Sequence, residues 1–337
     1  MENRYVICGR SALNYWRAQF GASPLAENRT AWHEPRNCDE RYKQASELLV
    51  ALGLPAPLDI VVPNSNLRKT SSIATYHYFN HRMSQEDVEQ IADDVLVCKP
   101  ALAIAQNSVR TPVYEVLLLM LEFCGTYLIS PGSEAGFVNI ESPLLSVENF
   151  REVFGEKGRV PRYGKTRRDT ALGLLAAGSN SPAESAIYTM LSLPTALGGY
   201  EVPGIELNQP VTLSTDAQEM LGCEKIRPDF LLPGAMTAGE YKSRAFHPEG
   251  TWTNDDRRID ALEASGYHTF TLNNERVRNL KDLGSIATTL LARLGISRPK
   301  PDASILNQQL DLHRRLFSTP HKQPACHPST FGKTSRY

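Results

Sequence analysis

The sequence predicts an α/β protein, with a carboxy-terminal mixed sheet flanked by helices and a separate mixed α+β domain before it. From about residue 180 the chain passes through a helical pattern, three or four short apolar stretches, a second helix, a further strand and a last helix. This order is typical of one mixed sheet covered by helices. The length of 337 residues is also enough for two domains of ordinary size.

Helical spacing in the first half predicts helices over residues 10–20 and 40–53. Strands are expected in LDIVVP, which begins at Leu58, and in SSIATYHYFN, which begins at Ser71. Two further helices are expected from Ser84 to Val95 and from Thr111 to Phe123. The first half is therefore mixed in character.

The second half opens with a clear helix start. Ser181, Pro182 and Glu184 combine a cap, proline at the first helical position and the acid of a capping box. Strands are then predicted in the stretches EVPGIELNQPVTL, IRPDFLLP, TAGEYKSRAF and YHTFTL. Helices are predicted in NDDRRIDALEASG and from Asn279 to Leu294.

Periodicity weakens between about residues 132 and 178, where glycine and charge accumulate, so the domain boundary is expected there. Two segments are basic, residues 151–168 and 297–337, each with seven basic side chains against two acidic ones. Such segments either contact phosphates or serve as a solvated linker and a disordered tail. We therefore expect an amino-terminal domain (1–150), a basic linker (151–179), an α/β domain (180–296) and a basic, flexible tail (297–337).

Composition predicts a cytoplasmic protein without a membrane span. The hydrophobic fraction is 41% and the charged fraction 22%, and no apolar run approaches the roughly 20 residues that a membrane helix needs. The first ten residues do not resemble a secretory leader. The six cysteines are widely spaced, which indicates neither a zinc site nor a disulfide framework. Cys124, inside an apolar stretch, is expected to be a small core residue.

The residues that carry chemistry are Asp229, Glu240 and Lys242. Glu240 and Lys242 are two apart on a predicted strand, so both side chains point to one face, and Asp229 precedes them on the neighbouring strand. Phosphodiester hydrolysis needs a hard cation, carboxylates that hold it and a group that positions water. We expect Asp229, Glu240 and the carbonyl of Tyr241 to bind Mg²⁺, with Mn²⁺ as a substitute, and Lys242 to orient the attacking water. The alternative is an exposed Glu/Lys strand face beside an Asp that caps a turn.

The same segment resembles the very-short-patch-repair-endonuclease-like proteins, a branch of the PD-(D/E)XK nuclease superfamily. The resemblance runs over about 115 residues, through RPDFLLP, EYKSRAFH and DDRRIDALEASGYHTFTL. Glu240, His247, Asp255 and Arg258 match motif positions of that branch, whereas Lys242 and Ser243 replace its Asp-Gly and restore the Glu-x-Lys of the wider superfamily. The resemblance implies a restriction-endonuclease-like domain that cleaves DNA with a divalent cation.

Further site residues follow from this resemblance. Glu184 matches an acid that such nucleases carry on the first helix, although a capping box explains it equally well. His247 is a candidate proton donor or phosphate contact, or else an ordinary loop residue. We expect DNA contacts from Arg258 and Arg244 of this segment, and from Arg167 and Arg168 of the basic segment 151–168. Asp255 and Arg258 lie one helical turn apart and also suit a structural pair.

The amino-terminal half is similar, over shorter stretches, to AbiEi-type antitoxin and regulator proteins. The matching segments are CGRSALNYWR, LDIVVP and VCKPALAIAQNSV. This resemblance implies that the first half chooses a DNA target or binds a protein partner. The segment GRVPRYGKT, which begins at Gly158, looks like a phosphate-binding loop but has five residues between its glycines where that motif requires four. Nucleotide binding is therefore not predicted there.

Together these features predict a magnesium-dependent DNA endonuclease of bacterial defence, repair or mobile-element biology. The alternative is a non-catalytic AbiEi-like regulator or antitoxin that binds DNA through an inactive nuclease fold. RNA as the substrate would use the same site. The sequence leaves the target and the oligomeric state open.

Overall fold

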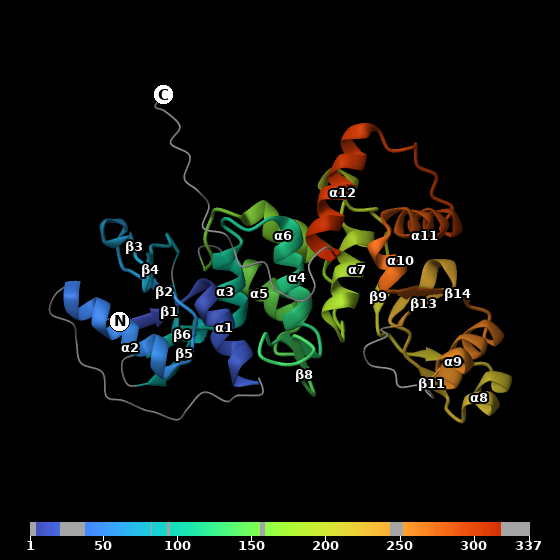
Figure 1. The fold of residues 1–337 in the computed structure, drawn as a ribbon, viewed down its shortest axis with the longest axis horizontal. Coiled ribbons are helices and arrows are strands. Elements are labelled where there is room, and N and C mark those ends of the chain that lie inside the picture. Colours follow the sequence, from blue (N-terminus) through green and yellow to red (C-terminus); the bar gives the residue numbers. More distant parts are fainter. Residues whose placement is uncertain are drawn as a thin grey trace.

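The computed structural model describes residues 5–20, 38–81, 83–92, 95–155, 159–242 and 252–317. Their fold is α/β, as predicted, with a six-stranded sheet in the first half and a four-stranded sheet in the second (Figure 1). Helices of the middle of the chain lie between the two sheets (Figure 1). Short 3-10 helices are present at Ser65–Leu67, Gln85–Asp87, Thr195–Leu197 and Pro233–Ala235.

The first sheet has the strand order β3-β4-β2-β1-β6-β5. Its central strands are apolar and buried because helices cover them. Strand β1 pairs with β2 antiparallel and with β6 parallel. The expected strands at Leu58 and Ser71 are confirmed as β2 and β4. The strands are β1 (Tyr5–Ile7), β2 (Leu58–Val61), β3 (Lys69–Thr70), β4 (Ala74–His77), β5 (Val88–Ala92) and β6 (Val95–Cys98).

Helices α1 (Gly9–Gln19) and α2 (Cys38–Ala51) confirm the predictions for residues 10–20 and 40–53. Helix α3 (Pro100–Asn107) packs against α1. It begins with proline at its first position and carries small and apolar side chains that are almost all buried. Both α1 and α3 follow parallel strands, β1 and β6, and so begin at the same edge of the sheet.

The helix expected from Ser84 to Val95 is wrong. The start signal itself is real, because the Asp87 carboxylate accepts hydrogen bonds from the backbone nitrogen and hydroxyl of Ser84, at 2.8 and 2.9 Å. Only a 3-10 turn is formed, and the chain then becomes strand β5, which pairs with β6. A cap fixes where a turn begins, whereas pairing with a neighbouring strand determines the conformation of the residues beyond that turn.

The middle of the chain is helical. Helix α4 (Val113–Phe123) confirms the prediction for residues 111–123, and five of its apolar side chains and the adjoining Cys124 are buried. A small hairpin comes next, β7 (Tyr127–Ile129) and β8 (Phe137–Asn139), and then α5 (Val147–Gly155) and α6 (Lys165–Leu174). Helix α6 packs against α4. The segment expected to be a linker thus contains a packed helix.

The second sheet has the order β14-β13-β12-β9, with α9 connecting the parallel strands β13 and β14. The predicted order of helix, strands, helix, strand and helix is confirmed, but the short helix α8 was not predicted. Ser214 caps it by accepting a hydrogen bond from the backbone of Ala217. The elements are α7 (Pro182–Ser192), β9 (Glu206–Leu207), β10 (Val211–Thr212), α8 (Thr215–Leu221), β11 (Lys225–Ile226), β12 (Phe230–Leu232), β13 (Thr237–Lys242), α9 (Trp252–Ala264), β14 (His268–Asn273), α10 (Asn274–Arg278) and α11 (Leu280–Arg293).

The two faces of this sheet bury different cores because side chains alternate along each strand. Phe230 and Leu232 belong to the large hydrophobic core, which also contains residues of the amino-terminal half. Leu231 and Ala238 point the other way, into a smaller core that includes Ala261 of α9. The face toward α9 is the one that carries the candidate site.

The carboxy-terminal segment was expected to be a flexible tail, and this is wrong for residues 303–317. They form helix α12 (Ala303–Phe317), which packs against α7. Leu312 is buried, and His313 Nε2 lies 2.9 Å from the carbonyl oxygen of Val277. Apolar residues recur at helical spacing in this segment and indicate a helix, whereas the excess of basic residues had indicated a flexible tail. Among the described residues, no helix is both long enough and apolar enough to cross a bilayer.

Candidate functional site

Strand register brings the two predicted acids together. Phe230 of β12 pairs with Gly239 of β13, so Asp229, the residue before β12, lies beside Glu240. The Asp229 carboxylate accepts a hydrogen bond from the backbone nitrogen of Tyr241 at 2.7 Å. It therefore lies against the segment of β13 that carries Glu240. Lys242 is on the same face, because it is two residues beyond Glu240.

Arg258 of α9 lies on the Glu240 carboxylate. Its Nη2 is 2.9 Å from Glu240 Oε1 and 2.8 Å from the carbonyl oxygen of Arg227. The Glu240 side chain is 14% exposed and that of Arg258 is 34% exposed. The sequence predicted that Arg258 contacts DNA. The structure places its guanidinium in the site itself, where its positive charge offsets the negative charge of Glu240.

Lys242 makes a weaker contact with the same helix. Its Nζ lies 3.1 Å from Asp256 Oδ1, and the Asp256 side chain is 73% exposed. A pair this exposed contributes only about 0.2–1 kcal/mol to stability. The Lys242 ammonium can therefore exchange this partner for a phosphate or a water at little cost.

Glu184, at the first turn of α7, is buried and accepts several hydrogen bonds. Its carboxylate accepts from the backbone of Asn180 (2.9 Å), from Ser181 Oγ (2.8 Å) and from Asn208 Nδ2 (2.7 Å). Its own backbone nitrogen donates to Ser181 Oγ, so the predicted cap at Ser181 is confirmed, but the Glu184 carboxylate accepts from the backbone nitrogen of Asn180 and not from that of Ser181. Burial raises the pKa of Glu184, and the nearby charge of Glu240 raises it further. Glu184 therefore lies within electrostatic reach of the strand acids.

Asn208 is the residue that sequence reasoning missed. It is buried and has a φ of 51°, in the left-handed region that asparagine tolerates better than most residues. Its side chain donates to Glu184 and to the carbonyl of Gly178, while its backbone nitrogen donates to the carbonyl of Asp229 at 3.2 Å. Asn208 thus connects helix α7 to the strand that carries Asp229. In sequence, Asn-Gln-Pro looks like an ordinary turn.

A glycine directly before Glu240 shapes the core side of β13. A Cβ atom at Gly239 would lie 2.2 Å from the ring of Phe270, its neighbour on β14. The Phe270 ring therefore occupies the space that a side chain at position 239 would fill, and it also contacts Phe230 at a ring distance of 6.4 Å. Packing of an aromatic ring over a strand glycine strengthens the pairing of the two strands.

Of the other predicted residues, Arg167 and Arg168 belong to α6 and do not lie at this site. Arg168 was expected to contact DNA, and this is wrong, because the side chain is 2% exposed and its guanidinium binds backbone carbonyls. Arg167 is exposed on α6, outside the second sheet. Arg244, His247 and the side chain of Asp255 lie outside the described residues.

The carboxylates of Asp229 and Glu240 are chemically suited to bind a hard divalent cation. Carboxylate oxygens are the ligands that Mg²⁺ prefers, and Mg²⁺ is commonly held by one or two carboxylates together with substrate phosphates and water. Asp229 and Glu240 supply two such groups. Within the described ranges, no group of three or more His, Cys, Asp or Glu side chains is arranged to hold a metal ion. The role expected for the Tyr241 carbonyl stays a prediction.

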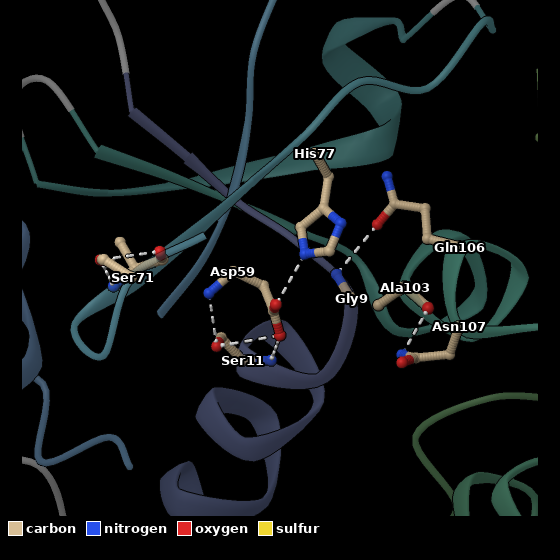
Figure 2. A network of polar contacts seen from close by, with 9 residues as sticks. Gly9, Ser11, Asp59, Ser71, His77, Ala103, Gln106 and Asn107 are labelled. Carbon is tan, nitrogen blue, oxygen red and sulfur yellow. Dashed lines mark hydrogen bonds and ion pairs between the residues drawn. The ribbon is translucent and has the colours of Figure 1, made fainter. Parts of the chain in front are cut away.

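A second polar cluster lies in the first sheet (Figure 2). His77 Nε2 of β4 is 2.7 Å from Asp59 Oδ1 of β2, and Asp59 Oδ2 accepts hydrogen bonds from the backbone and hydroxyl of Ser11 on α1. Beside it, the backbone nitrogen of Gly9 donates to Gln106 Oε1 of α3 at 3.1 Å. The cluster joins two strands, the start of α1 and the last turn of α3, and the Asp59 carboxylate accepts hydrogen bonds from Ser11 and pairs with His77.

Comparisons of the chain with models of protein families, with curated proteins and with solved structures gave no match. The assignment of function therefore rests on the geometry of the site and on the residues of its motifs.

Proposed function

We propose that the protein is a magnesium-dependent DNA endonuclease whose active site contains Asp229, Glu240 and Lys242. The observation that carries the proposal is the register of β12 and β13. It puts two carboxylates side by side and an ammonium group on the same sheet face, two residues further along. Two like charges in adjacent positions are costly unless a cation joins them.

The chemistry rests on these groups. A divalent cation bound by Asp229 and Glu240 would supply positive charge where the scissile phosphate becomes more negative. Lys242 offers a second positive charge and a donor that holds the attacking water. Glu184 interacts electrostatically with Glu240 and is the group that would reach the metal or its bound water from the first helix. The resemblance of the Asp-x-x-Arg motif to the very-short-patch-repair-endonuclease-like proteins, and of Glu-x-Lys to the wider PD-(D/E)XK superfamily, supports DNA as the substrate and a role in bacterial defence or repair.

The test is plasmid cleavage by the purified protein in Mg²⁺ or Mn²⁺, with EDTA as the metal-free reference. We expect nicked or linear plasmid with metal, none with EDTA, and none with Glu240→Ala. The matched control is Glu219→Ala, which removes an exposed carboxylate on α8. Cleavage that survives Glu240→Ala, or that never appears with either metal, would show the proposal to be wrong.

One observation favours the regulator as a second candidate. Glu240 and Lys242 both have internal partners on α9, Arg258 and Asp256, so these two charges are balanced without a cation. A regulator would bind duplex DNA with the same affinity in Mg²⁺ and in EDTA, and Glu240→Ala would leave that affinity unchanged. A nuclease would lose cleavage in the same variant.

A further inference from the structure

We propose that the segment Arg159–Arg167, which comprises the loop before α6 and the first turn of that helix, is a binding site for single-stranded DNA. The loop lies outside the second sheet, and its function does not depend on the nuclease proposal. Three features support this site: two buried arginines that hold the loop, an exposed tyrosine at its tip, and basic side chains around an open depression.

Buried arginines fix the loop at both ends. Arg159 is 11% exposed and binds Asp87 Oδ1 at 2.7 Å. Arg168 is 2% exposed, donates to the carbonyls of Pro161 (2.6 Å) and Tyr163 (3.0 Å), and lies over the ring of Phe154. Burying a guanidinium is costly unless its donors are satisfied. Here Arg168 satisfies its donors with the backbone of the exposed loop, and the loop is held in one conformation.

The loop also fits tightly against α3. A Cβ atom at Gly164 would lie 2.6 Å from the carbonyl oxygen of Ser108, and Gly164 has a φ of 82°. Arg167 donates to the carbonyl of Val109 at 2.8 Å. The loop is therefore preorganised, which lowers the entropy cost of binding a ligand.

The side chains that the loop presents are cationic and aromatic. Tyr163 is 79% exposed, the largest exposed fraction among the large aromatic side chains of the described residues. Arg162 and Lys165 flank it, and with Arg167 they line an open depression of about 720 Å³. Lys165 forms an ion pair with Asp169, at a separation of four residues on the surface of α6. Such an exposed pair is weak, so Lys165 can turn to a phosphate at little cost.

Phosphates and unpaired bases match this chemistry. Arginine and lysine attract the backbone, while an exposed aromatic ring stacks on a base face. In a duplex the base faces are already stacked on each other, so only a single strand offers them to Tyr163. A nucleoside triphosphate is less suited, because the spacing of Gly158 and Gly164 does not make the phosphate-binding loop of nucleotide hydrolases.

The test is fluorescence anisotropy of a fluorescein-labelled oligothymidine, with a blunt duplex of equal length for comparison. EDTA is present throughout, so that the DNA stays intact and failure of the nuclease proposal does not affect the result. We expect the single strand to bind more tightly than the duplex. Tyr163→Ala should weaken binding by about tenfold, and Tyr163→Phe should bind like the wild type.

Charge is tested with Arg162→Gln, which should weaken binding and reduce the slope of log K against log salt by about 0.7. The matched control is Arg314→Gln on α12, an exposed arginine far along the chain, which should change neither. Equal affinity for single strand and duplex, or wild-type binding by Tyr163→Ala, would overturn the proposal. The variants change exposed side chains only, so all of them are expected to fold.

Discussion

The two polar clusters of this protein contain similar residues but balance their charge in different ways. In the first sheet, Asp59 is the only acid of its cluster and is matched by Ser11 and His77 (Figure 2). In the second sheet, Asp229 and Glu240 lie side by side, and the charge of Glu240 reaches the buried Glu184. One arrangement ties strands and helices together. The other places two carboxylates side by side, with the guanidinium of Arg258 on one of them.

The largest expected effect separates these two clusters directly. Asp229→Asn should reduce plasmid cleavage by about a thousandfold or more, because an amide is a poor metal ligand, and should leave thermal stability unchanged or slightly higher. Asp59→Asn should leave cleavage per folded molecule unchanged and lower stability by about 1–2 kcal/mol, through its bonds to Ser11 and His77. Cleavage assays and thermal melts of both variants check this. The comparison fails if the two variants behave alike.

His77 offers a second way to break the comparison. His77→Ala removes the partner of Asp59 and the stacked contact with Phe79, so we expect a loss of about 1–2 kcal/mol in unfolding free energy and no change in cleavage. Chemical denaturation measures the loss. A fall in cleavage without a fall in stability would mean that the first cluster, too, takes part in function.

Arg258 sharpens the comparison from the other side. Arg258→Gln removes the guanidinium charge that is paired with the Glu240 carboxylate. Divalent cations should therefore bind a fewfold more tightly and raise the melting temperature more than in the wild type. Titration of Mg²⁺ against thermal stability measures this. If Arg258 contacts DNA instead, as its motif implies, the variant should lose DNA affinity with no change in the response to Mg²⁺.

The smallest expected effect concerns the pH dependence of stability at Glu184. Because burial and Glu240 raise its pKa in the folded state, the folded protein holds this proton more tightly than the unfolded chain does. The contribution to stability is present below the ordinary pKa of 4.5 and is lost as pH rises through the raised value. Glu184→Gln should therefore gain stability relative to the wild type as pH increases. Thermal melts of both proteins across this pH range measure the effect, and a difference that does not change with pH would contradict the raised pKa.

Much of the second half could be predicted from sequence because its signals are local. The cap at Ser181 and the alternation around Glu240 depend on neighbours a few residues apart. The strand β5 could not be predicted, since it depends on pairing with β6. The burial of Arg168 could not be predicted for the same reason. Its partners, which include the Ser108 hydroxyl and the Pro161 carbonyl, come within reach only when the chain folds. Asn208 has no signal at all, because its role depends on Glu184 and Asp229 being brought together.

Gly239 places a steric demand next to the acid that carries the proposed chemistry. A methyl group there would lie 2.2 Å from the Phe270 ring, so the ring would have to leave its place over β13. Adjacent residues of a strand point to opposite faces, so this ring and the Glu240 side chain lie on opposite faces of β13. Glycine before the acid thus lets an aromatic ring cover one face of the strand while the other face holds the carboxylate against Arg258 of α9.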